Sequence, residues 1–212
     1  MHQLSTEVGC RLINAHDLPV TARILAEVFS RDEPLASAVR QSPTEIEQLA
    51  LLIGAKAVGE RLAFLAHDGA GEVLGAALLH DFGAPPPNAL SAIGPTSRPI
   101  VALLESLERT YEMLHEVRPG AYAHIFMIGV MPSASGRGVA GRLLASVLAN
   151  AQGRGYRFAF TEATSSGSQR LFRRAGFREI GASRYATFEF EGRRPFATID
   201  TPESALLMER EL

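Results

Sequence analysis

The sequence predicts an α/β fold built as one domain over residues 1–212. Short apolar segments with strand-like alternation are separated by amphipathic segments with helical spacing, a pattern typical of strands covered by helices. A chain of 212 residues is long enough to bury a sizeable core. No internal repeat or low-complexity linker divides the chain, so we expect a single domain.

In the first half of the chain, the clearest local signal is a helix start at residue 43. Ser42 is a good N-cap, Pro43 suits the first helical position, and Glu45 completes a capping box. Asp17 is a plausible cap for an earlier helix through Phe29. The other elements expected here are strands over residues 8–14, 62–66 and 73–80 and a short helix over 32–40.

The second half begins with a long loop over residues 82–97, rich in Gly, Pro, Ala and Ser, which is a candidate lid. An amphipathic helix over 98–117 and a strand over 121–130 should follow it. Beyond these we expect a helix from residue 139, a strand over 157–161, a helix over 165–175 closed by Gly176, and two or three strands at about 183–191, 196–199 and 204–209.

The most informative segment is residues 127–144, where an apolar strand runs into a glycine-rich loop and then a helix. Gly136, Gly138 and Gly141 let the backbone approach a phosphate with no Cβ in the way. The amides and dipole of the helix start favour an anion, and Arg137 can add a charge-assisted contact. The segment predicts a phosphate cradle, although a tight turn alone can also be glycine-rich.

The spacing of this loop resembles the GCN5-related N-acetyltransferases more than other phosphate-binding families. It lacks the Gly-Lys-Ser/Thr of a Walker loop and the Gly-x-Gly-x-x-Gly of a dinucleotide site. In the superfamily a Gln or Arg precedes two small residues, which match Gly138 and Ala140, whereas Ser135 departs from the pattern. A second block, residues 168–177, is similar to the late helix of the superfamily and lies about 30 residues further on.

That resemblance implies a mixed sheet of about seven strands, helices on both faces, and two parallel middle strands splayed by a bulge. Gly129 fits such a bulge. It also implies acetyl-CoA as acyl donor, with pantetheine along the splayed strand and pyrophosphate on the loop amides. The expected cofactor-binding residues are Ile128, Gly129, Val130, Ser135, Gly136, Arg137, Gly138, Val139, Ala140, Gly141, Arg142, Ser168 and Phe172.

Glu33 is the leading candidate for a general base. An amine of pKa near 10 is only about one part in a thousand neutral at pH 7, a handicap of about 4 kcal/mol, so acetyl transfer needs a base. The Asp-Glu-Pro-Leu sequence at residues 32–35 resembles the arylalkylamine branch typified by insect dopamine acetyltransferases, whose motif Glu is the proposed base. The alternative is a solvated helix start, where acidic residues are common.

Other candidates for proton transfer lie on or after the middle strands. His124 resembles strand histidines that act through water in vertebrate-type enzymes, although a lone strand histidine is often structural. Glu162 could line the cleft. Phe172 replaces the Tyr that often serves the coenzyme A sulfur, and the resemblance assigns the hydroxyl role to Thr164 and Ser168, for which helix capping is the alternative.

Composition narrows the classes of function and partner. The net charge of −2 without a basic stripe argues against nucleic acid, and no apolar run reaches membrane-spanning length. We therefore expect a cytoplasmic monomer or homodimer. Cys10 is the only cysteine, which excludes an internal disulfide and a cysteine-based metal cluster, and we expect no metal.

The leading hypothesis is direct acetyl transfer to a small primary amine, such as an arylalkylamine or a polyamine. Two alternatives remain open: a non-catalytic acyl-CoA-binding or regulatory protein, favoured by Phe172 and Ser135, and a protein-modifying acetyltransferase.

Overall fold

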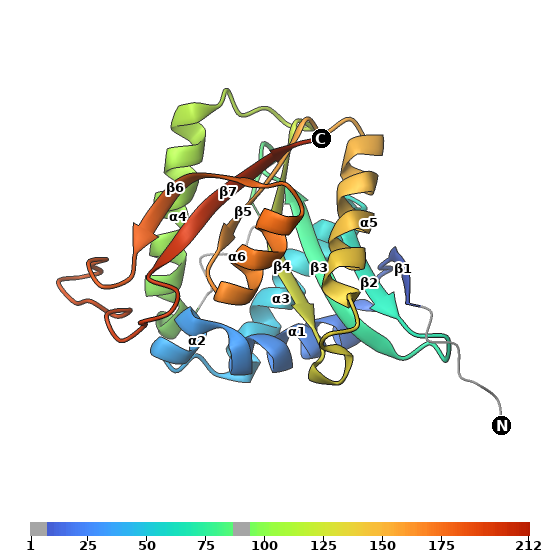
Figure 1. The fold of residues 1–212 in the computed structure, drawn as a ribbon, viewed down its shortest axis with the longest axis horizontal. Coiled ribbons are helices and arrows are strands. Elements are labelled where there is room, and N and C mark those ends of the chain that lie inside the picture. The colour runs from blue at the N-terminus through green and yellow to red at the C-terminus, as the bar shows by residue number, and fades with distance from the viewer. Residues whose placement is uncertain (1–7, 87–93) are drawn as a thin grey trace.

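A seven-stranded sheet in the order β1-β2-β3-β4-β5-β7-β6 forms the centre of the molecule (Figure 1). The computed structural model describes residues 8–86 and 94–212. Neighbouring strands are antiparallel except β4 and β5, which are parallel. The strands are β1 (Gly9–Leu12), β2 (Ala63–His67), β3 (Val73–Asp81), β4 (Tyr122–Val130), β5 (Phe158–Ala163), β6 (Arg178–Arg184) and β7 (Ser204–Glu211).

Helices cover both faces of this sheet, as predicted. On one face α5 and α6 pack over the strands, and on the other α1 and α3 cover one half while α2 and α4 cover the other. Alternate residues of a strand serve opposite faces: Phe64 packs under α5, and Leu65 packs under α1 and α3. The helices are α1 (Leu18–Asp32), α2 (Pro34–Ala38), α3 (Pro43–Gly59), α4 (Arg98–Leu114), α5 (Val139–Gly153) and α6 (Ser166–Arg174).

The two predicted helix caps have different outcomes. The Ser42–Glu45 capping box of α3 is present, with both reciprocal hydrogen bonds. Asp17 makes no side-chain cap for α1, so that prediction is wrong. Its carboxylate instead pairs with Arg11 at 2.7 Å and accepts from the Asn14 amide, which ties the loop to β1.

The C-terminal region contains two strands, β6 and β7, the lower of the two numbers expected. β6 begins earlier than predicted, and residues 196–199 form turns instead of a strand. Pro195 and Pro202 lack the amide hydrogens that a strand ladder needs. Phe196 is nevertheless fully buried, so its apolar character reflects packing of a loop against the core.

Three further predictions concern the candidate lid, Cys10 and membrane-spanning segments. The candidate lid over residues 82–97 includes residues 87–93, which lie outside the described residues. Cys10 is half-buried and packs against the core under α5. Within 8–86 and 94–212 no helix combines the length and apolar character needed to cross a bilayer.

The parallel pair β4 and β5 separates partway along its length. Pairing runs only from Tyr122 opposite Phe158 to His124 opposite Phe160. Next to this point, the register of β4 against β3 shifts between Ile125 and Met127, which identifies Phe126 as the bulged residue. The predicted splay is therefore present, and its bulge lies at Phe126 instead of Gly129.

Gly129 has a packing role in place of the expected bulge. A Cβ built at this residue would lie 3.1 Å from Leu25 Cδ2 and 3.2 Å from Val28 Cγ1, both on α1. The absent side chain lets α1 lie close against the separated end of β4, and this brings the end of α1 toward the opening.

Candidate active site

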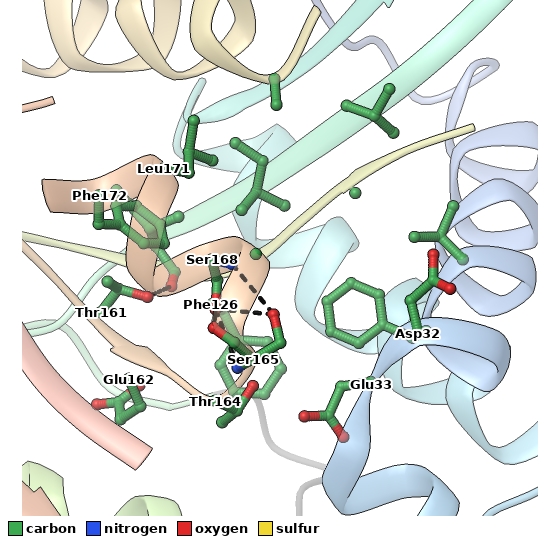
Figure 2. A pocket seen from close by; sticks show the side chains of 18 residues that line it. Asp32, Glu33, Phe126, Thr161, Glu162, Thr164, Ser165, Ser168, Leu171 and Phe172 are labelled. Carbon is green, nitrogen blue, oxygen red and sulfur yellow. Dashed lines mark hydrogen bonds between the residues drawn. The ribbon is translucent and has the colours of Figure 1, made fainter. Parts of the chain in front are cut away.

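A cleft of about 290 Å³ opens where β4 and β5 separate (Figure 2). Its walls come from the end of α1, the bulged part of β4, the end of β5 and the first turns of α6. Phe29, Phe126 and Phe172 form apolar walls, and Glu33, Glu162 and Thr164 contribute polar groups. The fold thus brings together residues that are more than a hundred positions apart in the chain.

Glu33 lies between α1 and α2 and faces this cleft. Its Oε2 accepts the Ala36 amide at 2.6 Å, which caps α2. Its Oε1 is buried and has no hydrogen-bond partner among the described residues. Burial raises the pKa of the carboxyl to about 7, although the Ala36 amide and the Thr164 hydroxyl favour the ionised form.

The alternative role considered for Glu33, a solvated acidic residue at a helix start, describes its neighbour Asp32 better. Asp32 has 54% of its side chain exposed and pairs with the adjacent Arg31 at 2.5 Å. Two consecutive carboxylates therefore have different surroundings, and only Glu33 combines a desolvated carboxyl with a pKa near neutrality. A group of this kind is suited to exchange protons at physiological pH.

The hydroxyl residues at the start of α6 line the opposite side of the cleft. Ser165 caps the helix: its Oγ accepts the Ser168 amide at 3.1 Å. The Ser168 hydroxyl donates to the Ser165 carbonyl at 2.9 Å. Ser168 thus has the capping role given as its alternative and also lies on the cleft wall with Thr164.

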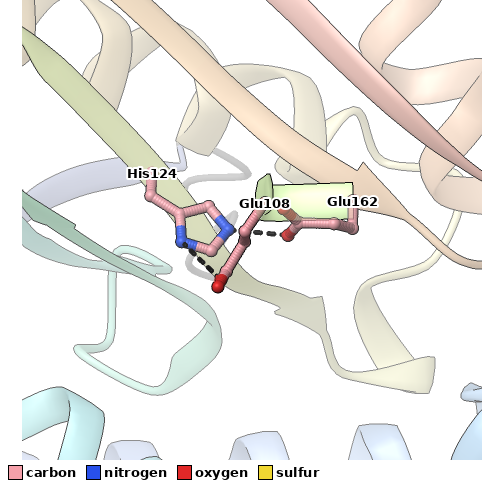
Figure 3. Close-up of side chains that lie close together, drawn as sticks. All are labelled: Glu108, His124 and Glu162. Atoms are coloured by element: carbon pink, nitrogen blue, oxygen red, sulfur yellow. Dashed lines mark hydrogen bonds and ion pairs between the residues drawn. The ribbon is translucent and has the colours of Figure 1, made fainter. Parts of the chain in front are cut away.

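His124 is completely buried and does not line the cleft. It reaches the cleft through Glu162, whose Oε2 lies 2.7 Å from His124 Nε2 (Figure 3). On its other side, His124 Nδ1 lies 3.0 Å from His80 Nε2 and 3.9 Å from Glu108 Oε1. Burial disfavours the imidazolium, but the attraction of Glu162 and Glu108 outweighs this effect and raises the pKa of His124.

The hydrogen bonds define where the protons lie in this buried cluster. His80 Nδ1 faces the Asp81 carbonyl at 3.3 Å, so it carries a proton, and burial lowers the pKa of His80 to about 3. Neutral His80 therefore offers Nε2 as an acceptor to Nδ1–H of His124. Consequently one proton is shared between His124 Nε2 and Glu162 Oε2.

Three possible metal ligand atoms lie within 4.8 Å of one another in this cluster, one each from Glu108, His124 and Glu162. Both nitrogens of His124 already make hydrogen bonds, and Glu162 Oε2 is one of their partners. Glu162 Oε1 has no hydrogen-bond partner within the described part of the chain, and the expectation of no metal stays a prediction.

The glycine-rich loop lines a second cavity of about 600 Å³ that continues from the cleft. The two cavities share Val130, Ala140, Gly167 and Leu171 as lining residues. Gly136 and Gly138 both have φ of +74°, which a side chain would strain. Among the described residues, no backbone acceptor pairs with the amides of residues 138–141, as expected at a helix start.

Two arginines expected at the loop have a different position or role. The Arg142 amide donates to the Gly138 carbonyl at 3.1 Å, so the free amides end at Gly141. The side chains of Arg137 and Arg142 do not line the second cavity, whereas Arg170, Arg174 and Arg210 do. Arg170 and Arg174 are four residues apart on α6, and that spacing was a signal that they share a face.

Phe172 is 1% exposed and lies between the cleft and the core. Its ring packs edge-on against Phe177, with 5.0 Å between centroids. The sequence departure from Tyr is therefore accommodated as apolar packing.

Comparison with known proteins agrees with this architecture. The condensation domain of Ebony with beta-alanyl-dopamine superposes with a TM-score of 0.89 at 18% identity, covering 98% of this chain and 100% of that one. Arylalkylamine N-acetyltransferase 2 from Aedes aegypti superposes with a TM-score of 0.80 at 22% identity, covering 97% of this chain and 99% of that one. A Drosophila melanogaster polyamine N-acetyltransferase that forms N-acetylagmatine superposes with a TM-score of 0.79 at 20% identity, covering 97% of this chain and 100% of that one. No curated protein sequence matches significantly. Residues 25–177, about three quarters of the chain, match the sequence model of the Acetyltransferase (GNAT) family, so the chain belongs to this family and is an acyltransferase.

Proposed function

We propose that this enzyme transfers an acetyl group from acetyl-CoA directly to the primary amine of a small molecule, such as an arylalkylamine or a polyamine. One observation carries the proposal: Glu33, a desolvated carboxyl with a pKa of about 7, lies in a cleft that continues into the glycine-rich cavity. The solved structures named above include enzymes for both amine classes, and at 18–22% identity they support the fold rather than a choice between substrates.

The second cavity has the chemistry that coenzyme A requires. Free amides of residues 138–141 lie at a helix N-terminus, where an anion is favoured. Arg170 and Arg174 add positive charge on the facing helix. The separated backbone of residues 128–130 leads from there to Glu33, so a pantetheine arm lying along it brings its thioester into the cleft.

Within the cleft, Glu33 takes the proton from the substrate ammonium through Oε1. The neutral amine then forms a C–N bond with the thioester carbonyl as the C–S bond breaks. The nitrogen of the new amide loses its second proton, and the leaving thiolate takes up that proton to become the free thiol. Thr164 supports the ionised form of Glu33, and Ser168 is the hydroxyl we assign to the leaving sulfur. His124 is too deeply buried to meet the substrate and acts only through Glu162.

An acetyl-CoA thiol-release assay over a panel of amines tests this function, with the acetylated product identified by mass spectrometry. We expect amine-dependent release for at least one amine class. Binding of acetyl-CoA without release for any amine or peptide would instead support the non-catalytic alternative, and release with peptides alone would support a protein-modifying enzyme. Because the Ebony domain is a condensation domain, β-alanyl-CoA belongs in the donor panel.

A further inference from the structure

Two glutamates that line the cleft each have one buried carboxylate oxygen without a hydrogen-bond partner. Glu33 Oε1 and Glu162 Oε1 are both buried and make no hydrogen bond within the described part of the chain. They belong to different elements, the α1–α2 junction and the end of β5, and both residues line the same cleft (Figure 2). Proton abstraction by Glu33 uses only the first of them.

We propose that Glu162 anchors a second positive charge on the substrate, so that the preferred acceptors are diamines or polyamines instead of monoamines. The inference rests on the acetyl transfer proposed above. Glu33 receives the ammonium group that reacts, and Glu162 receives the distant ammonium or guanidinium group.

The surroundings of Glu162 favour this assignment. His124 holds Oε2 at 2.7 Å and thereby directs Oε1 away from the buried cluster. The same contact gives this carboxylate a hydrogen-bond donor, because His124 offers Nε2–H. Glu108 lies 3.9 Å from His124 on its other side, and burial together with the nearby Glu162 raises the pKa of Glu108 to about 7.

The remaining cleft wall offers no competing positive charge. Among its described lining residues are Asp32, Glu33 and Glu162, and none is Lys, Arg or His. Phe29 and Phe126 provide apolar contact for the carbon chain between the two amines. A monoamine filling the cleft would leave Glu162 Oε1 without a partner, which is costly for a buried charge.

Three acceptors with one carbon chain test the proposal: putrescine, butylamine, and the amino alcohol of equal length. With the intact protein we expect kcat/KM for putrescine to exceed that for each of the other two by at least about tenfold, which is about 1.4 kcal/mol. The KM for putrescine should also rise more steeply with salt than the KM for butylamine, because a second charge pair is screened. This comparison of acceptors uses only the unsubstituted protein.

Glu162→Gln keeps the shape of the side chain and removes its charge. We expect the ratio of putrescine to butylamine kcat/KM to fall to near one. Glu116→Gln is the matched control, since Glu116 is exposed, pairs with Arg118 and lines neither cavity, and its ratio should stay within about twofold. Melting temperatures and acetyl-CoA affinity report whether each variant is folded.

The results that would overturn the role of Glu162 differ from the result that would refute acetyl transfer itself. Equal kcat/KM for putrescine and butylamine in the intact enzyme would overturn the anchor while leaving acetyl transfer in place. An amino alcohol as good as putrescine would show recognition of a neutral donor instead of a charge. Equal losses for all three acceptors in Glu162→Gln would make Glu162 part of proton transfer. Absence of acetylation for every amine would refute the proposed function itself.

Discussion

His124 Nε2 and Glu162 Oε2 lie 2.7 Å apart, and this contact joins a completely buried imidazole to the wall of the substrate cleft. The pair depends on the short paired stretch of β4 and β5, because His124 and Phe160 are register partners and Glu162 lies two residues beyond. His124 also stacks on Phe160 with 4.5 Å between ring centroids and 5° between planes. Its position is therefore fixed by sheet pairing, ring packing and hydrogen bonds together.

Replacing His124 with Gln should weaken the fold in a pH-dependent way. The pKa of His124 is raised above its ordinary 6.5 in the folded protein. Its contribution to the free energy of unfolding is therefore fully present below 6.5 and is lost as pH rises through the higher folded value. We expect His124→Gln to lose about 3–5 kcal/mol below 6.5, since it leaves buried carboxylates without their cation.

Urea unfolding of both proteins over a pH series measures this effect. The free energy of unfolding of the unsubstituted protein should fall with rising pH across the window above 6.5. The variant should show a smaller fall, which comes from Glu33 with its raised pKa of about 7. Equal stabilities throughout would mean that His124 is neutral in the folded state.

A negative charge at Gly141 should weaken acetyl-CoA binding without harming the helix. Gly141 lies in the first turn of α5, where an acidic residue is normally favourable, and a Cβ there meets nothing within 4 Å. Gly141→Asp places a carboxylate beside the proposed phosphate position. We expect at least about tenfold weaker binding by calorimetry, about 1.4 kcal/mol.

Gly141→Asn is the matched neutral variant and should bind acetyl-CoA within about threefold of the unsubstituted protein. If the Asp and Asn variants bind equally well, the phosphates lie elsewhere. The same experiment separates charge from shape, because the two side chains have nearly the same size.

Adding a hydroxyl at Phe172 should not create a better enzyme. Phe172 is almost fully buried and packs on Phe177, so it serves as an apolar wall. We expect kcat of Phe172→Tyr to remain within about threefold of the unsubstituted value in the thiol-release assay. A large gain in kcat would show that the site lacks an acid and would favour a decayed or regulatory protein.

Thr164 should tune the pKa of Glu33. Its hydroxyl favours the ionised carboxylate, so Thr164→Val should raise the pKa of Glu33 above its value of about 7. The acidic limb of the kcat/KM profile should then move to higher pH, while the rate at alkaline pH changes less. Thr164→Ser retains the hydroxyl and is the control, with a limb close to the original position. A limb that stays in place for Thr164→Val would mean that this hydroxyl does not act on the base.

Local sequence signals predicted the features that local chemistry determines. The Ser42–Glu45 capping box depends on residues close in the chain, and both of its hydrogen bonds are present. Asp17 shows the limit of such signals, because Arg11 on a neighbouring element competes for its carboxylate.

Long-range features of the site were harder to predict. The bulge falls at Phe126, and Gly129 instead lets α1 pack closely against β4, which no local pattern reveals. The sequence suggested Glu33, His124 and Glu162 separately. Their burial and the contact between His124 and Glu162 depend on strand register and helix packing. Arg210 reaches the second cavity from β7, and no motif indicated it.

The pH–rate profile of Glu33→Gln tests the central claim most directly. Glu33 must be ionised to accept a proton, so kcat/KM of the unsubstituted enzyme should rise with pH through an acidic limb near 7, the raised pKa of this carboxyl. Glu33→Gln preserves the shape and can still accept the Ala36 amide. It should lower kcat about 10²- to 10⁴-fold, abolish that limb, and leave acetyl-CoA affinity unchanged. Near-normal turnover at neutral pH, or an acidic limb that persists in the variant, would contradict the account and place the base elsewhere in the cleft.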